Sequence, residues 1–225
     1  MEKLKTVQNI RIKPKLKISE LVEQMSLTGY QGRKLGEALE AFIEMIKDPE
    51  VTIFLGLAGA MAVAGQAEII KWLIANNYID VLVPTGANIT EDIVMTMGFD
   101  YYLGNHITDD KKLFLSGFNR YYDVYGKESD YIKMTELLSD IINGINSDKM
   151  YSSRSLLDYI GKNLYSREYK SILGLAAWKD VPVFCPALID SPVGDALLIS
   201  KSKGYEITVN AVQDYSEFIG MNNYV

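Results

Sequence analysis

The stretch from Ile79 to Asp92 constrains the fold of this chain more than any other part of the sequence. It begins as an apolar run, breaks at Pro84 into a turn of small residues, and ends in an acidic pair. A short apolar run bounded by turn signals is typical of a fully buried, parallel strand. Ligands of open α/β sheets collect at the carboxyl ends of such strands, so a small-molecule site is expected at Thr85 to Asn88.

Two other segments follow the same pattern. Residues 51–57 read as a buried strand, and a helix after them runs to about Asn77, so residues 51–84 form a βαβ unit. Residues 181–185 form another apolar run, which leads into a Gly/Pro turn at 186–195 and a helix start. This order predicts an α/β fold with a mostly parallel sheet. Residues 56–65 lack the GxGxxG spacing, so their small side chains indicate either close approach to a phosphate or tight helix packing.

The rest of the chain is mainly helical by its apolar spacing. Two helices are expected within 19–47, with Ser19 as the N-cap, a break at Gly29 and Gly32, and an end at Asp48. Further expectations are a brief strand at 100–104, an irregular segment at 105–128, helices at 131–145, 153–162 and 166–178, and either strand then helix or one helix at 206–219. Residues 1–18 are expected to form a basic arm, and 19–225 a single α/β domain.

Composition excludes several classes of protein. With 48% hydrophobic and 23% charged residues the chain is typical of soluble globular proteins, and no apolar run is long enough to span a bilayer. The single cysteine, Cys185, lies in an apolar run, which indicates a buried inert thiol and a reducing, cytoplasmic setting. His106 is the only histidine. No metal-ligand spacing occurs, so no metal centre is expected.

Charge is unevenly distributed along the chain. The first 17 residues carry six basic side chains, and the rest is therefore more acidic than the net charge of −6 suggests. An acidic body repels nucleic-acid phosphates and suits a cation of polyamine size. The basic arm is interpreted as a solvated or partner-docking terminus rather than a nucleic-acid tail.

Four acids follow the predicted strands and are the candidate polar ligands. Asp190 lies at a strand's carboxyl end, where it could accept hydrogen bonds from ribose hydroxyls, and Asp195 could face an amine. Glu91 and Asp92 are expected at a helix start, where the helix dipole stabilises carboxylates. Simple N-capping is the alternative interpretation for each pair.

The same segments resemble the deoxyhypusine synthase family. The resemblance is carried by IFLGLAGA at 53–60, NNYIDVLVPTGANITED at 76–92 and VPVFCPALIDSPVGD at 181–195. YLGN at 102–105 and SSR at 152–154 follow in family-like order, so the resemblance spans about residues 7–220. It implies a Rossmann-like α/β domain, with a mostly parallel sheet flanked by helices, that assembles as a homotetramer.

The resemblance also implies which residues bind ligands. The positions that match NAD contacts are Gly59, Ala60, Met61, Ala62, Val63, Thr85, Gly86, Ala87, Glu91 and Asp190. The positions that match spermidine contacts are Thr90, Glu91 and Asp195. The family has an acid where this chain has Thr90, which leaves one fewer charge for the amine.

By resemblance, the activity is NAD-dependent transfer of the aminobutyl group of spermidine, through an enzyme lysine imine, to a lysine of a hypusine-bearing translation factor or to another amine. Family members continue beyond the second signature to a Trp-Gly-Lys segment that supplies the nucleophile. Here Trp178 precedes Lys179-Asp180 and comes before that signature, so no catalytic residue is assigned. A catalytically incomplete NAD- and polyamine-binding paralogue or regulatory subunit stays open as the alternative, as does a generic nucleotide-binding domain.

Overall fold

Two units make up the chain in its computed structural model, which describes residues 4–221. They are Met1–Val51 and Thr52–Val225. The predicted arm over 1–18 and single domain over 19–225 stay a prediction.

The first unit is a pair of helices, α1 (Ile18–Met25) and α2 (Tyr30–Lys47). The expected break at Gly29 is confirmed, and α2 ends before Asp48 as predicted, whereas Gly32 lies inside α2 and does not break it. The predicted N-cap is wrong: Lys17 occupies that position, and its N–H donates to the Glu20 carboxylate at 3.1 Å. The helix therefore begins one residue before Ser19.

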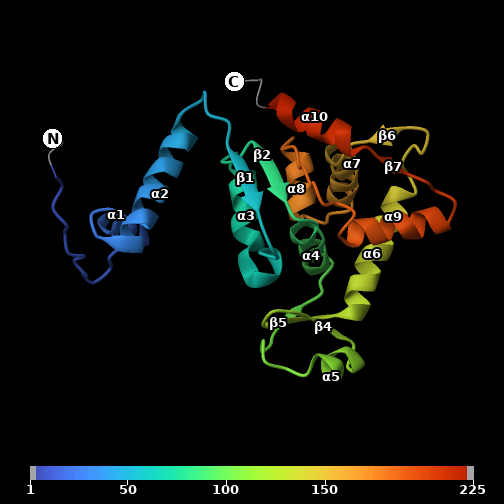
Figure 1. Ribbon diagram of the computed structural model, residues 1–225, viewed down its shortest axis with the longest axis horizontal. Helices are drawn as coiled ribbons and strands as arrows, with labels where there is room; N and C mark the ends of the chain where they lie inside the picture. The colour runs from blue at the N-terminus through green and yellow to red at the C-terminus, as the bar shows by residue number, and fades with distance from the viewer. Residues whose placement is uncertain (1–3, 222–225) are drawn as a thin grey trace. The chain divides into compact units, whose positions relative to one another are not determined.

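A parallel sheet forms the centre of the second unit. Strand β1 (Phe54–Leu57) pairs with β2 (Val81–Pro84), with Phe54 opposite Val81. The crossover between them is a short π-helix, η1 (Ala62–Gln66), followed by α3 (Ala67–Ala75), as the predicted βαβ unit requires. The apolar run at 181–185 joins β2 only through a parallel bridge between Leu82 and Val183. Helix α4 (Gly86–Thr96) follows β2 directly, so its first residues lie at the carboxyl edge of the sheet (Figure 1).

An antiparallel sheet occupies the region that was expected to be irregular. Its strands are β3 (Tyr101–Leu103), β5 (Val124–Lys127) and β4 (Phe118–Tyr121), in that spatial order, with α5 (Asp110–Leu115) before the hairpin. Tyr122, at φ 57°, makes the tight turn between β4 and β5. The expected strand at 100–104 is confirmed, whereas the expectation of irregular structure over 105–128 is wrong.

Helices make up most of the remaining chain. They are α6 (Glu128–Ile142), α7 (Ser153–Ser166), α8 (Ile172–Trp178), α9 (Pro192–Ser202) and α10 (Ala211–Met221), and the short strands β6 (Met150–Tyr151) and β7 (Thr208–Val209) pair in parallel. The alternative left open at 206–219 is settled as strand then helix. Helix α8 begins later than residue 166 because the Ser171 hydroxyl caps it, accepting from the Gly174 N–H at 3.0 Å.

The mixed α/β class is confirmed by this arrangement. Leu82 is fully buried between its two sheet neighbours, and Ile89 and Ile93 of α4 are fully buried as well. Within residues 4–221, none of the helices has the length and apolar character needed to cross a membrane.

Candidate functional site

Three turns meet at the carboxyl edge of the parallel sheet. They follow β1, β2 and the segment that bridges at Val183. The Thr85 hydroxyl donates to the carbonyl oxygen of Gly59 at 2.6 Å, which joins the first turn to the second. A Cβ on Gly86 would overlap the side chain of Ser191, so the second turn also packs tightly on the third. The structure therefore brings together the segments that the sequence identified separately.

Asn88 holds the first two turns together; the sequence placed it within the expected site but did not predict this role. Its side chain is fully buried. The amide oxygen accepts from the N–H groups of Met61 and Ala62 at 2.9 and 3.3 Å, and the amide nitrogen donates to the Gly59 carbonyl at 2.9 Å. An asparagine directly after a buried strand is visible in the sequence, but its hydrogen-bond partners are not, because they lie 26 to 29 residues away along the chain. Asn88 thus fixes the backbone of the first turn.

Replacing Asn88 with alanine is expected to lower the free energy of unfolding by about 2 kcal/mol, because it leaves buried N–H groups without an acceptor. Urea unfolding measures the change. Asn76→Ala is the matched control, since that exposed amide only donates to the Trp72 carbonyl. Equal losses in the two variants would contradict the role given to Asn88.

Glu91 lies within α4 with its side chain buried. Its Oε2 atom has no hydrogen-bond partner among the residues that the structure describes. Burial raises the pKa of this carboxyl group to about 8. The expectation that Glu91 and Asp92 lie at a helix start is wrong: Thr85 caps α4 and the acids follow beyond its first turn. N-capping therefore does not explain Glu91.

Three tyrosines lie close enough to Glu91 for its charge to affect them, and the sequence did not identify them; the Tyr101 hydroxyl also donates to the Glu91 backbone carbonyl at 3.4 Å. Tyr101 comes from β3, Tyr121 from β4 and Tyr131 from α6. Burial raises the pKa of each, and the negative charge of Glu91 adds to the rise in all three. The pKa of Tyr131 rises only to about 12, because hydrogen bonds with Thr90 and Tyr121 lower the pKa and partly offset the effect of burial. We call Tyr101, Tyr121 and Tyr131 the tyrosine wall.

Asp92 has a different environment from its neighbour. It is fully buried, and it accepts from the Ile172 N–H at the start of α8 and pairs with Lys71 Nζ at 3.1 Å. Burial raises the pKa of Asp92, and the nearby Lys71 charge only partly opposes the shift. Asp92 thus joins α3, α4 and α8, which is a structural role.

The remaining predicted residues differ in accessibility. Asp190 and Asp195 are exposed, and neither caps α9, because the Ser191 hydroxyl accepts from the Val193 N–H at 3.3 Å. Asp195 lines a hollow of about 580 Å³ and its charge contributes to the raised pKa of Tyr131. Thr90 is buried and its hydroxyl donates to the Gly86 carbonyl at 3.0 Å. Of the other predicted positions, Ala60 and Met61 lie in the first turn, Ala62 and Val63 are buried in η1, and Ala87 is half-buried at the start of α4.

Neither His106 nor Cys185 lies in an environment typical of a catalytic residue. His106 stacks on Tyr122 with 5.1 Å between ring centroids, at the exposed hairpin. Cys185 is buried, and burial raises the pKa of its thiol to about 11, which makes it a poor nucleophile. Across residues 4–221, no three His, Cys, Asp or Glu side chains are grouped to hold a metal ion.

Comparison with known proteins supports the family resemblance of the sequence motifs at 53–60, 76–92 and 181–195. A family model described as deoxyhypusine synthase matches residues 20–223. "Probable deoxyhypusine synthase 2" of Archaeoglobus fulgidus is 40% identical over 195 residues, which cover 87% of this chain and 65% of the relative. The protein of the same name in Methanosarcina mazei is 38% identical, over 89% of this chain and 58% of the relative. The "Deoxyhypusine synthase-like protein" of Coxiella burnetii is 30% identical, over 94% and 61%.

The fold has a counterpart among solved structures. A crystal structure from Entamoeba histolytica assigned to the deoxyhypusine synthases superposes with a TM-score of 0.67 at 20% identity, over 91% of this chain and 70% of that one. The chain spans 58% to 65% of the length of the three curated relatives described above. The family match extends over both sequence signatures and almost all of the helices and strands. The chain belongs to the deoxyhypusine synthase family.

Proposed function

We propose that this chain supplies one wall of a site for NAD-dependent transfer of the aminobutyl group of spermidine. The observation that carries the proposal is Glu91, a buried carboxylate with an unpartnered oxygen on α4, the helix that begins at the edge where the three turns meet. A buried acid without a partner is costly, so it marks a functional site more often than a structural one. The names of the relatives support the reaction class.

The three turns fit a dinucleotide. Gly59 has a positive φ of 60° with open space beside its Cα, so the backbone there is accessible. The exposed carboxylate of Asp190 suits ribose hydroxyls. The N–H groups of Met61 and Ala62 are already bound to Asn88, which leaves those of Gly86 and Ala87 for a phosphate. We propose that NAD lies across this edge of a Rossmann-like sheet.

Glu91, Thr90 and Asp195 are proposed to hold the polyamine. An ammonium group beside Glu91 would neutralise its buried charge, and the hydroxyls of the tyrosine wall could complete its hydrogen bonds. Asp195, exposed in the first turn of α9, can attract a second ammonium group from solvent. One buried and one exposed acid could pair with two different ammonium groups of a flexible polycation.

Bound NAD would supply the hydride acceptor for oxidation of the amine. The chain's own contribution is to bind, orient and desolvate the amine at Glu91. Lys71 does not serve as the nucleophile: burial lowers its pKa, but Asp92 and Glu68 outweigh that effect and keep it raised, hence protonated. The acceptor is proposed to be a lysine of a hypusine-bearing translation factor or another amine, and the assembly a cytoplasmic homotetramer.

A second candidate function is binding without chemistry, as a regulatory paralogue. It is favoured by Lys71 being held in an ion pair with Asp92 at 3.1 Å, where this lysine is not free to act as a nucleophile. Both candidates predict NAD and polyamine binding, and only the first predicts turnover.

Replacing Asp195 with alanine is expected to weaken spermidine binding about tenfold and to leave NAD binding unchanged, because one exposed ion pair is lost. Titration calorimetry with spermidine and a thermal shift with millimolar NAD give the two readouts. Asp148→Ala, at another exposed acid, is the control. Unchanged spermidine affinity in the Asp195 variant would refute its role, and absence of any shift with NAD would refute the cofactor site.

A further inference from the structure

The inner face of the antiparallel sheet carries two members of the tyrosine wall. Tyr101 lies opposite Gly126 in the register, and Tyr121 lies two residues from Asn119, the other partner of Gly126. Directly paired residues share a face of the sheet, so the rings of Tyr101 and Tyr121 meet over Gly126, with 5.7 Å between their centroids. A Cβ at Gly126 would lie 2.8 Å from the Tyr101 ring. Glycine therefore makes room for the tyrosine pair.

The outer face of this sheet has a separate set of contacts. The Tyr102 ring packs edge-on against Phe118, with 5.8 Å between centroids, and Lys127 Nζ lies 5.5 Å from the centroid of the Tyr102 ring. The ion pairs of the region, which include Arg120 with Asp110 at 2.6 Å, join its residues to one another. The sheet and α5 are therefore held together by their own interactions.

The attachment of this region to the rest of the second unit lies around Glu91. Residues 101–127 follow α4 through Gly98, which has a φ of 85°, and continue directly into α6 (Figure 1). The Tyr101 hydroxyl donates to the backbone carbonyl of Glu91 at 3.4 Å, which is long for a hydrogen bond from a hydroxyl group. A well-bonded sheet thus covers the buried acid through a weak contact.

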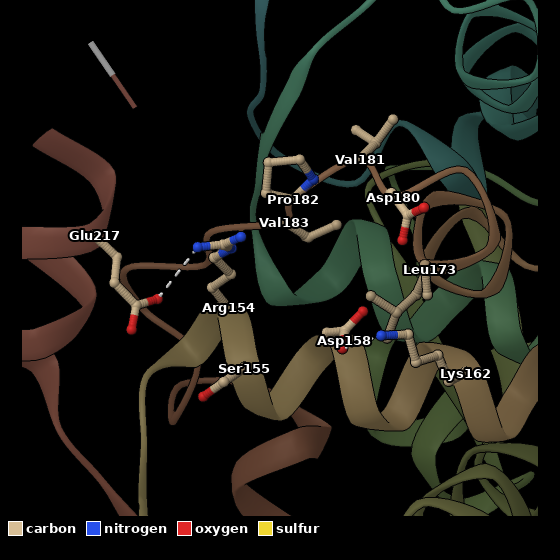
Figure 2. Close-up of a pocket in the computed structure, with 11 residues that line it drawn as sticks. Arg154, Ser155, Asp158, Lys162, Leu173, Asp180, Val181, Pro182, Val183 and Glu217 are labelled. Atoms are coloured by element: carbon tan, nitrogen blue, oxygen red, sulfur yellow. Dashed lines mark hydrogen bonds and ion pairs between the residues drawn. The ribbon is translucent and has the colours of Figure 1, made fainter. Parts of the chain in front are cut away.

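The buried carboxylate is not reached from either of two nearby hollows. Glu91 is 1% exposed, although its Oε2 atom has no partner among the described residues. Glu91 does not line the hollow of about 580 Å³ beside Asp195. It does not line a second hollow of about 330 Å³ either, and Figure 2 shows that one bordered by Arg154 and Lys162 of α7. An amine can therefore reach Glu91 only if the side chains that cover it move.

We propose that residues 101–127 form a lid over Glu91, and that this lid swings away to admit an amine to the unpartnered oxygen. Hinges usually lie at the ends of elements, so Gly98 and the start of α6 are the two ends about which the lid turns. Opening breaks the contacts that Tyr101 and Tyr121 make with α4 and α6, and leaves the pairing within the sheet intact. The lid therefore moves as one body.

This inference deepens the proposed function, and rests on it for the identity of the molecule that enters. The lid supplies the route by which spermidine reaches Glu91. Opening itself requires neither spermidine nor NAD, so it can be measured on the chain alone. A chain that opens but binds no spermidine would refute the proposed function and would support the lid.

Carboxyl labelling of the wild-type chain with a carbodiimide and glycine ethyl ester tests the opening. Glu91 and Asp92 are adjacent and are 1% and 0% exposed, but Asp92 contacts α3 and α8 rather than the lid. Lid opening exposes Glu91 alone, whereas global unfolding exposes both acids. Mass spectrometry is expected to find Glu91 labelled at least about tenfold faster than Asp92. Equal rates, or slower labelling of Glu91, overturn the proposal.

A pair of matched variants tests the contact that holds the lid closed. Tyr101→Phe removes the hydroxyl that donates to the Glu91 carbonyl, and is expected to raise the labelling rate of Glu91 about threefold and to leave Asp92 unchanged. Tyr102→Phe is the control, because that ring lies on the outer face, and both rates should stay as in wild type. Equal labelling of Glu91 in the two variants contradicts the lid, as does an equal rise at Asp92, which would indicate general destabilisation.

Discussion

Replacing Glu91 with glutamine is expected to stabilise the folded protein at pH 8.5 by about 3 kcal/mol and to change little at pH 4.5. Burial raises the pKa of Glu91 from 4.5 to about 8 in the folded chain. The folded state therefore holds this proton more tightly than the unfolded state does. The stability that the protonated group provides is fully present below about pH 4.5 and is lost as the pH rises towards 8. Glutamine has no charge to bury and avoids that loss.

Urea unfolding at the two pH values measures this effect. Glu136→Gln is the control, because that carboxylate is exposed on α6 and its replacement should change stability by less than about 0.5 kcal/mol at either pH. A Glu91→Gln variant that is less stable than wild type at pH 8.5 would mean that the charge of Glu91 is well compensated in the folded chain. The prediction would then be wrong.

Replacing Asp92 with alanine is expected to destabilise the fold by about 3 kcal/mol. The change leaves the Ile172 N–H without its acceptor. It also removes one of the two acids that pair with Lys71; the other, Glu68, remains at 2.8 Å. Asp92→Asn keeps an acceptor oxygen and should lose less. The comparison separates the hydrogen bond from the charge.

Asp158→Ala is the matched control for Asp92. It also breaks a carboxylate–lysine pair, with Lys162 at 2.7 Å, but both side chains are about half exposed. Exposed pairs contribute about 1 kcal/mol or less. Chemical denaturation of the three variants should give the largest loss for Asp92→Ala, and a loss no greater than that of Asp158→Ala would contradict its structural role.

The sequence predicted the parts of the fold that depend on local pattern. Apolar runs ending in small-residue turns located β1, β2 and the Val183 segment, and their shared pattern predicted an α/β fold. Asp48-Pro49 located the end of α2. These signals come from neighbouring residues, so they can be read without knowing the tertiary structure.

Long-range pairing was not predictable from the same signals. Strands β4 (FNRY) and β5 (VYGK) are four residues each and mix polar with aromatic side chains, so no clear alternation distinguished them from a loop. The tyrosine wall depends on that pairing and on α6. The environments of Glu91 and Asp92 likewise depend on Tyr131, Lys71 and Ile172, which are distant in sequence. Glu91 and Asp92 were therefore both predicted to lie at a helix start, although their side chains contact different residues.

Spermidine titration of wild type and Glu91→Gln at pH 6.5 and pH 8.5 tests the central claim most directly. The buried carboxyl group must release its proton before it can pair with an ammonium, so wild-type affinity is expected to rise with pH over this range. In Glu91→Gln, binding at pH 8.5 should be about tenfold weaker and nearly independent of pH. Asp195→Ala should keep the pH dependence. Equal affinity and equal pH dependence in wild type and Glu91→Gln would contradict the claim that Glu91 binds the polyamine.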